Sequence, residues 1–216
     1  MSAQVNQPTE HHLVLLRHGE SIGNAEKRHQ GQADYPLTEL GREQCRQLGE
    51  HWKAAEIHFD RIIASPLKRA RETAEILQGY LELEPAFNPL LMERDNGKLA
   101  GLTHQEALET LPPPAFVPLY QPIAETGESL WELYLRAGQA LNELLAHPPG
   151  STLVVGHGAQ FNMMIHAILG LAPEPNFQGP YFRLANTGFS GLVYYPQDGR
   201  WDINYHNQLP HLESTG

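Results

Sequence analysis

Short apolar runs alternate with amphipathic stretches along most of the chain. Three runs, over residues 13–16, 60–64 and 152–155, have the length and composition of short strands buried in a sheet. Between them, apolar residues recur at helical spacing, as Leu48 and Trp52 do at positions i and i+4. This alternation predicts an α/β fold, a three-layer α/β/α sandwich with a mostly parallel central sheet.

Residues that favour helix starts indicate where the helices begin. Thr38 is expected to cap a helix that runs to about Ala55. Ser65 is expected to cap the next helix, with Pro66 in its first turn and its end near Gly79. Two capping boxes predict further helix starts, Thr103 with Glu106 and Ser129 with Glu132.

The last part of the chain favours strands over helices. Strand-like runs lie near residues 181–186, 189–195 and 200–206. Asp198 and Gly199 predict a tight hairpin turn between the last two runs. A hairpin pairs antiparallel, so these late strands should add an antiparallel edge to the parallel sheet.

The length favours one domain, because 216 residues at roughly 150 residues per domain give about 1.4 domains. We expect a flexible tail over residues 1–10 and a single domain over residues 11–216. Residues 112–122 contain five prolines and could be a linker between two domains. The pieces on either side look too small to fold alone, which favours a proline-rich cover loop within one domain.

Composition and charge exclude several classes of protein. The 15 Lys and Arg against 25 Asp and Glu give a net charge of −10, which argues against a nucleic-acid-binding protein. The single cysteine, Cys45, excludes an internal disulfide framework. No run of 18 apolar residues predicts a membrane span, and the polar N-terminus does not have the profile of a signal peptide. We therefore expect a cytoplasmic protein with no membrane partner.

Side chains that can react or bind an anion follow three of the predicted strands. They are Arg17-His18-Gly19, the stretch from Ser65 to Arg69, and Gly156-His157-Gly158. In parallel sheets, ligands bind at the carboxyl ends of the strands, so these segments should meet at one edge. Arginines and helix N-termini there would bind an anion such as phosphate, and an imidazole could act as a nucleophile. From spacing alone, a structural or solvent-exposed role for each histidine stays open.

The sequence Leu16-Arg17-His18-Gly19-Glu20-Ser21-Ile22-Gly23-Asn24 resembles the signature of the histidine phosphatase superfamily, the phosphoglycerate mutase-like proteins. Six further segments resemble that family's conserved stretches in the same order. They cover residues 31–41, 65–74, 93–101, 127–129, 154–158 and 186–212. The resemblance thus spans nearly the whole chain and implies the phosphoglycerate mutase-like fold.

The resemblance implies a role for individual residues. His18 would be the nucleophile that accepts the phosphoryl group, and Glu93 would protonate the leaving oxygen and then activate water. Arg17, Arg69 and His157 would bind the phosphoryl oxygens and stabilise the transition state. Asn24 and the N–H of Gly158 would complete this phosphate-binding set. No metal and no other cofactor are implied, because the arginines supply the positive charge.

The family contains phosphatases and mutases that share this site. The mutases that we compare have Gly-Trp in the second stretch and His-Tyr-Gly after Glu-Arg, where this chain has Gly31-Gln32 and Asp95-Asn96-Gly97. These departures favour a phosphatase over a mutase. We therefore expect a metal-independent phosphomonoesterase that acts on a small phosphorylated metabolite. A phosphoglycerate mutase is the alternative. A phosphate-binding module without catalysis is less favoured, because His18 and Glu93 are both present.

The substrate and the partners are less constrained by the sequence. A possible substrate rim consists of Lys27, Arg28, Gln30 and Gly31. Its basic residues could hold a second anionic group of the substrate or form a solvated turn. Phe116 and Tyr120 could pack over an apolar leaving group, whereas Trp131 is better explained as core. A homodimer is possible, and no nucleic-acid partner is expected.

Overall fold

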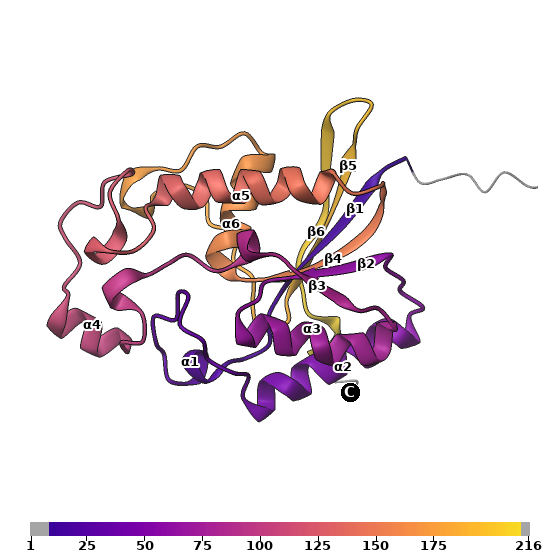
Figure 1. Cartoon of the computed structure of the whole chain (residues 1–216), viewed down its shortest axis with the longest axis horizontal. Coiled ribbons are helices and arrows are strands. Elements are labelled where there is room, and N and C mark those ends of the chain that lie inside the picture. Colours follow the sequence, from indigo (N-terminus) through magenta and orange to yellow (C-terminus); the bar gives the residue numbers. More distant parts are fainter. Residues whose placement is uncertain (1–8, 213–216) are drawn as a thin grey trace, which may run out of the picture.

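The computed structural model describes residues 9–212, which form one six-stranded sheet with helices on both faces (Figure 1). The strand order is β3-β2-β4-β1-β5-β6. The strands are β1 (His11–Arg17), β2 (Arg61–Ala64), β3 (Pro85–Phe87), β4 (Gly150–Gly156), β5 (Phe189–Tyr195) and β6 (Arg200–Gln208). The pairs β1–β4, β2–β4 and β2–β3 are parallel, while β5 pairs antiparallel with β1 and β6. The predicted sandwich and its antiparallel late edge are therefore confirmed.

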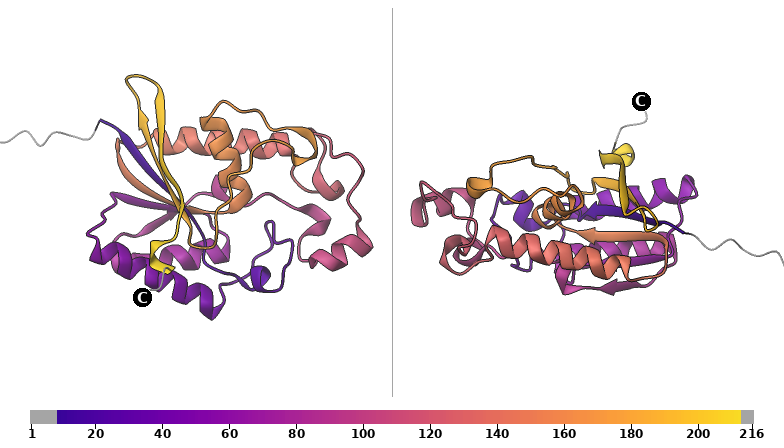
Figure 2. Two further views of the ribbon diagram at one scale, coloured as in Figure 1. Left: turned by 180° about the vertical axis from the view of Figure 1, so that it is seen from behind. Right: turned by 90° about the horizontal axis from the view of Figure 1, so that it is seen from above.

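The four long helices cover the two faces of the sheet in pairs. Helices α2 (Glu39–Ala54) and α3 (Lys68–Leu81) lie on one face, and α5 (Leu130–Leu145) and α6 (Gly158–Ile168) lie on the other (Figure 2). Two short helices, α1 (Ile22–Ala25) and α4 (His104–Thr110), lie beyond the carboxyl ends of the parallel strands. This end of the sheet is where the sequence places the candidate site.

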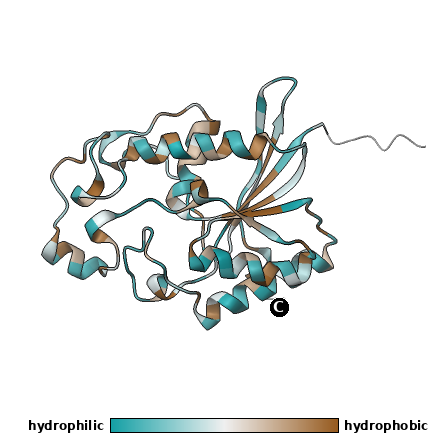
Figure 3. Ribbon diagram, in the orientation of Figure 1, coloured by the Kyte–Doolittle hydropathy of each residue, from teal (hydrophilic) through white to brown (hydrophobic). Residues whose placement is uncertain are grey.

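The apolar run of β1 is continuous because the strand is covered on both faces. Leu13 and Leu15 pack into the core shared with α5 and α6, whereas Leu16 packs into the core shared with α2 and α3. Both faces of a central strand are covered, so neither set of alternating side chains meets water. The hydropathy colouring shows the same concentration of apolar residues on the central strands (Figure 3).

Most of the predicted helix starts are confirmed. The Thr38 side chain accepts a hydrogen bond from the N–H of Gly41 at the start of α2, and both capping boxes form as predicted at α4 and α5. The prediction for Ser65 and Pro66 is wrong, because α3 begins only at Lys68 and Leu67 occupies the cap position. The Ser65 hydroxyl is instead hydrogen-bonded to Nε2 of His157 at 2.8 Å. Ser65 thus contacts His157 of the candidate site and is not the cap of α3.

The strand predicted near residues 181–186 does not form. This segment is irregular and crosses the end of the sheet, where Asn162 accepts a hydrogen bond from the N–H of Phe182 and the carbonyl of Leu184 accepts one from Arg17. Its backbone groups find side-chain partners, and no neighbouring strand is needed. The hairpin turn at Asp198 and Gly199 is confirmed.

Two other segments bear on the predicted organisation. Residues 112–122 form neither helix nor strand, and most of the tail predicted over residues 1–10 lies outside the described residues. Within residues 9–212, no helix combines the length and the apolar character that crossing a membrane would require.

The approach of α2 to the segment after β1 depends on a glycine. A Cβ atom at Gly41 would lie 2.0 Å from the carbonyl oxygen of Glu20, whereas a Cβ at Gly138 on α5 would meet no heavy atom within 4 Å. We expect Gly41→Ala to lower the free energy of unfolding by about 1–3 kcal/mol through overpacking. The matched Gly138→Ala should raise it by up to about 1 kcal/mol, because alanine favours helix over glycine. Urea denaturation measures both, and stabilisation by both substitutions would contradict the close approach.

Candidate active site

Three adjacent parallel strands bring the candidate residues together at one edge of the sheet. Arg17 at the end of β1 pairs in register with Gly156 at the end of β4, so His18 and His157 follow side by side. Their ring centroids are 5.1 Å apart. Arg69 enters from the first turn of α3, which follows β2. The polar cavity at this edge has a volume of about 310 Å³ and is lined by Arg17, His18, Asn24, Arg69 and Glu93, among others.

The hydrogen bond of His18 defines the state of its ring. Nδ1 lies 2.7 Å from the carbonyl oxygen of Gly19, which can only accept, so Nδ1 carries the proton and Nε2 has a free lone pair. Burial of the ring, followed by the positive charges of Arg69 and Arg17, holds the His18 pKa well below its ordinary value of 6.5. The ring is therefore neutral at pH 7, as a nucleophile must be.

Arg17 and Arg69 are held by backbone carbonyls. Arg69 donates from Nη1 to Ala33 at 2.9 Å and from Nη2 to Gly31 at 2.7 Å, and Arg17 donates from Nη1 to Leu184 at 2.6 Å. Among residues 9–212, neither guanidinium forms an ion pair, and the Nε atom of each is buried without a partner. Burial lowers the Arg69 pKa to about 10, so the group is still charged at pH 7. Their positive charge is therefore available for an anion.

His157 is the N-cap residue of α6 and is completely buried. Its Nε2 is hydrogen-bonded to Ser65, while its Nδ1 has no partner among the described residues. Burial is the main reason that the His157 pKa lies well below 6.5. The charges of Arg69, Arg17 and Arg136 lower it further, and so does repulsion from His18 once that ring is protonated. The neutral ring thus adds a polar group to the site without adding charge.

Glu93 lies against the start of α6. Its Oε1 accepts hydrogen bonds from the N–H groups of Arg94 and Gln160, at 2.9 and 3.1 Å, and its Oε2 accepts from Ala159 at 3.2 Å. Backbone N–H groups at a helix N-terminus bind carboxylates well. These bonds fix the carboxyl group at the wall of the cavity that also contains His18.

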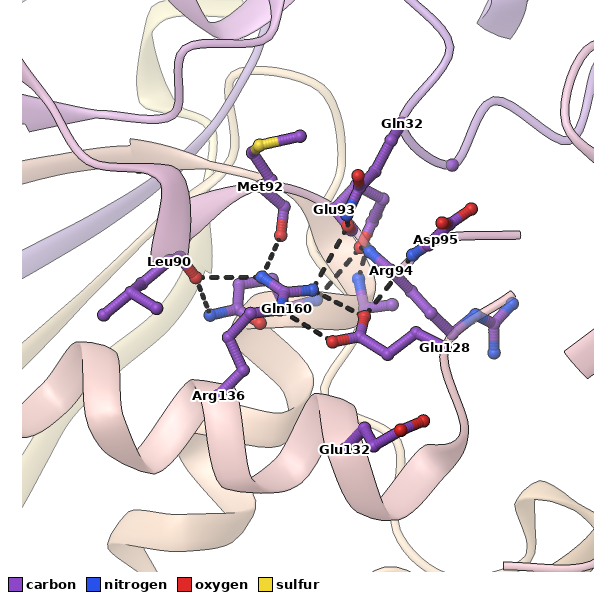
Figure 4. A network of polar contacts seen from close by, with 12 residues as sticks. Gln32, Leu90, Met92, Glu93, Arg94, Asp95, Glu128, Glu132, Arg136 and Gln160 are labelled. Atoms are coloured by element: carbon purple, nitrogen blue, oxygen red, sulfur yellow. Dashed lines mark hydrogen bonds and ion pairs between the residues drawn. The ribbon is translucent and has the colours of Figure 1, made fainter. Parts of the chain in front are cut away.

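A network around Arg136 on α5 positions the segment that carries Glu93 (Figure 4). Arg136 forms a two-pronged ion pair with Glu128, with N–O distances of 2.7 and 2.6 Å. It also donates to the carbonyls of Leu90, Met92 and Glu93. The backbone of residues 90–93 is therefore clamped to α5, which restricts where the Glu93 side chain can lie.

The other predicted residues are distributed around the cavity. Asn24 accepts hydrogen bonds from the N–H of Ser21 and from the side chain of Asn186, and Gly158 begins α6 beside Arg17. In the possible rim, Arg28, Gln30 and Gly31 line the cavity, whereas Lys27 is exposed outside it. Arg28 is paired with Glu26 at 2.5 Å, which offsets its charge.

Sequence reasoning did not identify the roles of Arg94, Ser65 and Arg136 in the site. Arg94 lines the cavity, and its Nε donates to Asn96 at 3.1 Å. Its position directly after Glu93 is a signal that could have identified it. The Ser65 contact and the Arg136 clamp join segments far apart in the chain, so no local spacing reveals them.

The chain is similar to a protein-family model and to several known proteins. Residues 13–208 match the family model for the histidine phosphatase superfamily (branch 1). A Bacillus subtilis (strain 168) protein named uncharacterized phosphatase PhoE is 33% identical over 200 residues, covering 93% of this chain and 96% of that protein. The probable phosphoglycerate mutase GpmB of Enterobacter sp. (strain 638) is also 33% identical, over 216 residues and 94% and 95% of the two chains. The structure of Bacillus stearothermophilus YhfR matches with a TM-score of 0.76 at 27% identity, over 94% of this chain and 99% of that one.

The lowered pKa values of His18 and His157 predict how stability depends on pH. Below pH 6.5 the imidazoles of the unfolded chain protonate, while these two rings stay neutral in the folded protein. Unfolding then takes up protons, so the free energy of unfolding should fall as pH drops from 6.5 towards 5. Each ring should contribute up to about 1.4 kcal/mol per pH unit.

The variant His157→Gln isolates one of these contributions. Urea denaturation between pH 7 and 5 should show a slope that is flatter than that of the wild type by up to about 1.4 kcal/mol per pH unit. A slope that does not change would contradict a buried neutral imidazole at this position.

Proposed function

The chain belongs to the histidine phosphatase superfamily, and on this premise we propose that it is a phosphoric monoester hydrolase that forms a phosphohistidine on His18 and needs no metal. The observation that carries the proposal is the state of His18. Its Nδ1–H donates to the carbonyl of Gly19, which leaves Nε2 free, and the charges of Arg17 and Arg69 surround the ring. A neutral nucleophile beside two available cations suits attack on a phosphate dianion.

In the first step, the Nε2 lone pair attacks phosphorus, an N–P bond forms, and the bond between phosphorus and the leaving oxygen breaks. Arg17 and Arg69 donate to the non-bridging oxygens, where charge is held in the transition state. The Gly19 carbonyl accepts from Nδ1–H and stabilises the cationic phosphorylated ring. Glu93 donates a proton to the leaving oxygen, so that a neutral alcohol departs.

In the second step, the Glu93 carboxylate takes a proton from water. The water oxygen attacks phosphorus, the N–P bond breaks, and Nε2 recovers its lone pair. Inorganic phosphate leaves, and Glu93 is again protonated, which completes the cycle. The clamp formed by Arg136 supports both steps, because it keeps the backbone of Glu93 in place between them.

Hydrolysis and mutase chemistry differ in the group that accepts the phosphoryl group from the phosphohistidine, which is water in one case and a substrate hydroxyl in the other. Relatives of about equal identity have names of both kinds. Gln32 replaces the tryptophan of the mutases that we compare, and it donates to the carbonyl of Glu93 at 3.1 Å. The absence of that tryptophan favours the phosphatase over the mutase. The cytoplasmic location, the small phosphorylated metabolite as substrate and the possible homodimer remain predictions.

The purified protein should hydrolyse 4-nitrophenyl phosphate in the presence of EDTA. His18→Ala should lower kcat/KM by about 10³-fold or more, because it removes the nucleophile. The matched control is His12→Ala, which changes an exposed histidine at the other end of β1 and should retain activity. Interconversion of 2- and 3-phosphoglycerate with negligible hydrolysis would overturn the proposal in favour of a mutase.

Glu93→Gln separates the two steps. The 4-nitrophenolate ion leaves without a proton, so phosphorylation of His18 should proceed while water attack slows by about 10²- to 10⁴-fold. Phosphohistidine should therefore accumulate and appear as an acid-labile mass increase on the peptide that contains His18. Glu50→Gln, at an exposed position of α2, should show no accumulation. Equal phosphohistidine levels in Glu93→Gln and in the wild type would contradict the role of Glu93 in the second step.

A further inference from the structure

A second, larger cavity adjoins the polar one. It has a volume of about 500 Å³ and lies among α4, the proline-rich segment and Phe177. His29 and His104 line both cavities, so the two spaces share a wall. We call the larger space the apolar chamber. Its size is within the range of pockets that bind small molecules.

The lining of the apolar chamber is mostly carbon. Leu108, Phe116 and Phe177 line it, and 63%, 55% and 48% of their respective surfaces are exposed. Large apolar side chains that gather around one hollow indicate a binding site more strongly than the same side chains scattered over the surface. The carboxylate in the lining, Glu125, is paired with Lys98. The chamber therefore offers apolar contact with little uncompensated charge.

The wall between the two cavities is built from flat groups. The rings of His29 and His104 lie 4.7 Å apart, and the Arg94 guanidinium lies 5.0 Å from the centre of the Phe177 ring. Burial, and then the neighbouring His104 and Arg94, lower the pKa of His29 below 6.5, so its ring is neutral at pH 7. A ligand that extends from the phosphate cavity would thus pass the neutral ring of His29 before it reaches the apolar lining.

We propose that the apolar chamber receives the leaving group of the substrate, so that the enzyme acts on phosphomonoesters of apolar alkyl or aryl alcohols. The inference rests on the proposed function, because Arg17 and Arg69 must hold the phosphate for the leaving group to extend this way. A polar leaving group such as a sugar would lose hydrogen bonds to water there and find few partners. An apolar chain would instead remove exposed carbon of Leu108, Phe116 and Phe177 from water.

Binding of alkylphosphonates tests the chamber without depending on catalysis, because their P–C bond is not hydrolysed. Titration calorimetry should show about fourfold tighter binding for each methylene that enters the chamber. Octylphosphonate should therefore bind at least about tenfold more tightly than butylphosphonate, with a more negative heat-capacity change. An affinity that does not depend on chain length would overturn the proposal.

Two variants of exposed residues test whether the dependence of affinity on chain length arises in the chamber. Leu108→Asp and Phe116→Ser should each reduce the ratio between octyl and butyl affinities at least about threefold, because each removes apolar contact area. Leu135→Asp is the matched control, since Leu135 on α5 is 55% exposed and does not line the chamber. Loss of the ratio in Leu135→Asp, or an undiminished ratio in both chamber variants, would overturn the assignment.

Hydrolysis of the corresponding alkyl phosphates distinguishes failure of this inference from failure of the proposed function. We expect kcat/KM to rise with chain length in parallel with phosphonate affinity. Hydrolysis of all chain lengths at one rate would overturn the apolar leaving group and leave the phosphatase intact. Binding that tightens with chain length, with no hydrolysis of any phosphate ester, would support the chamber and overturn the proposed function.

Discussion

Arg69 is a fully buried cation without a carboxylate partner among residues 9–212, and the construction of the site depends on stabilising it. Burying a charge costs several kcal/mol unless its hydrogen bonds are met. Here the carbonyls of Gly31 and Ala33 accept from the two Nη atoms, and they come from a loop that must bend sharply to present both. Gly31 supplies that bend with a φ of +50°. The loop after α1 therefore has its irregular course because a cation must be held without being neutralised.

The same charge sets the chemistry of its neighbours. Arg69 is the largest source, after burial, of the lowered pKa values of both His18 and His157. A carboxylate paired with Arg69 would remove this effect and would also compete with a phosphate. Placing the positive charge on arginine also preserves it, because burial lowers the Arg69 pKa only to about 10. The unpaired guanidinium of Arg69 thus contributes both to the anion site and, together with burial and Arg17, to the neutral state of His18.

The sequence allowed the sheet and the position of the site to be predicted, for reasons that are local. The runs at residues 13–16 and 152–155 are apolar because β1 and β4 are covered on both faces, and the reactive residues directly follow them. Ser65 was misassigned because serine before proline has a strong local preference for a helix cap, whereas a tertiary contact with His157 prevails. The clamp of Arg136 on residues 90–93 depends on how α5 packs, and no spacing along the chain encodes that.

The wall formed by His29 and His104 separates two cavities whose linings differ in how firmly they are tied to the fold. Residues at the strand ends are tied into the sheet and to one another, so a change at Arg69 alters the anion site and two histidines together. Leu108 and Phe116 are largely exposed, on a short helix and a loop, and substitutions at such positions usually change stability by less than about 0.5 kcal/mol. Selection can therefore vary the lining of the apolar chamber at little cost in folding. The division would let related chains diverge in preferred alcohol while the chemistry at the sheet edge stays the same.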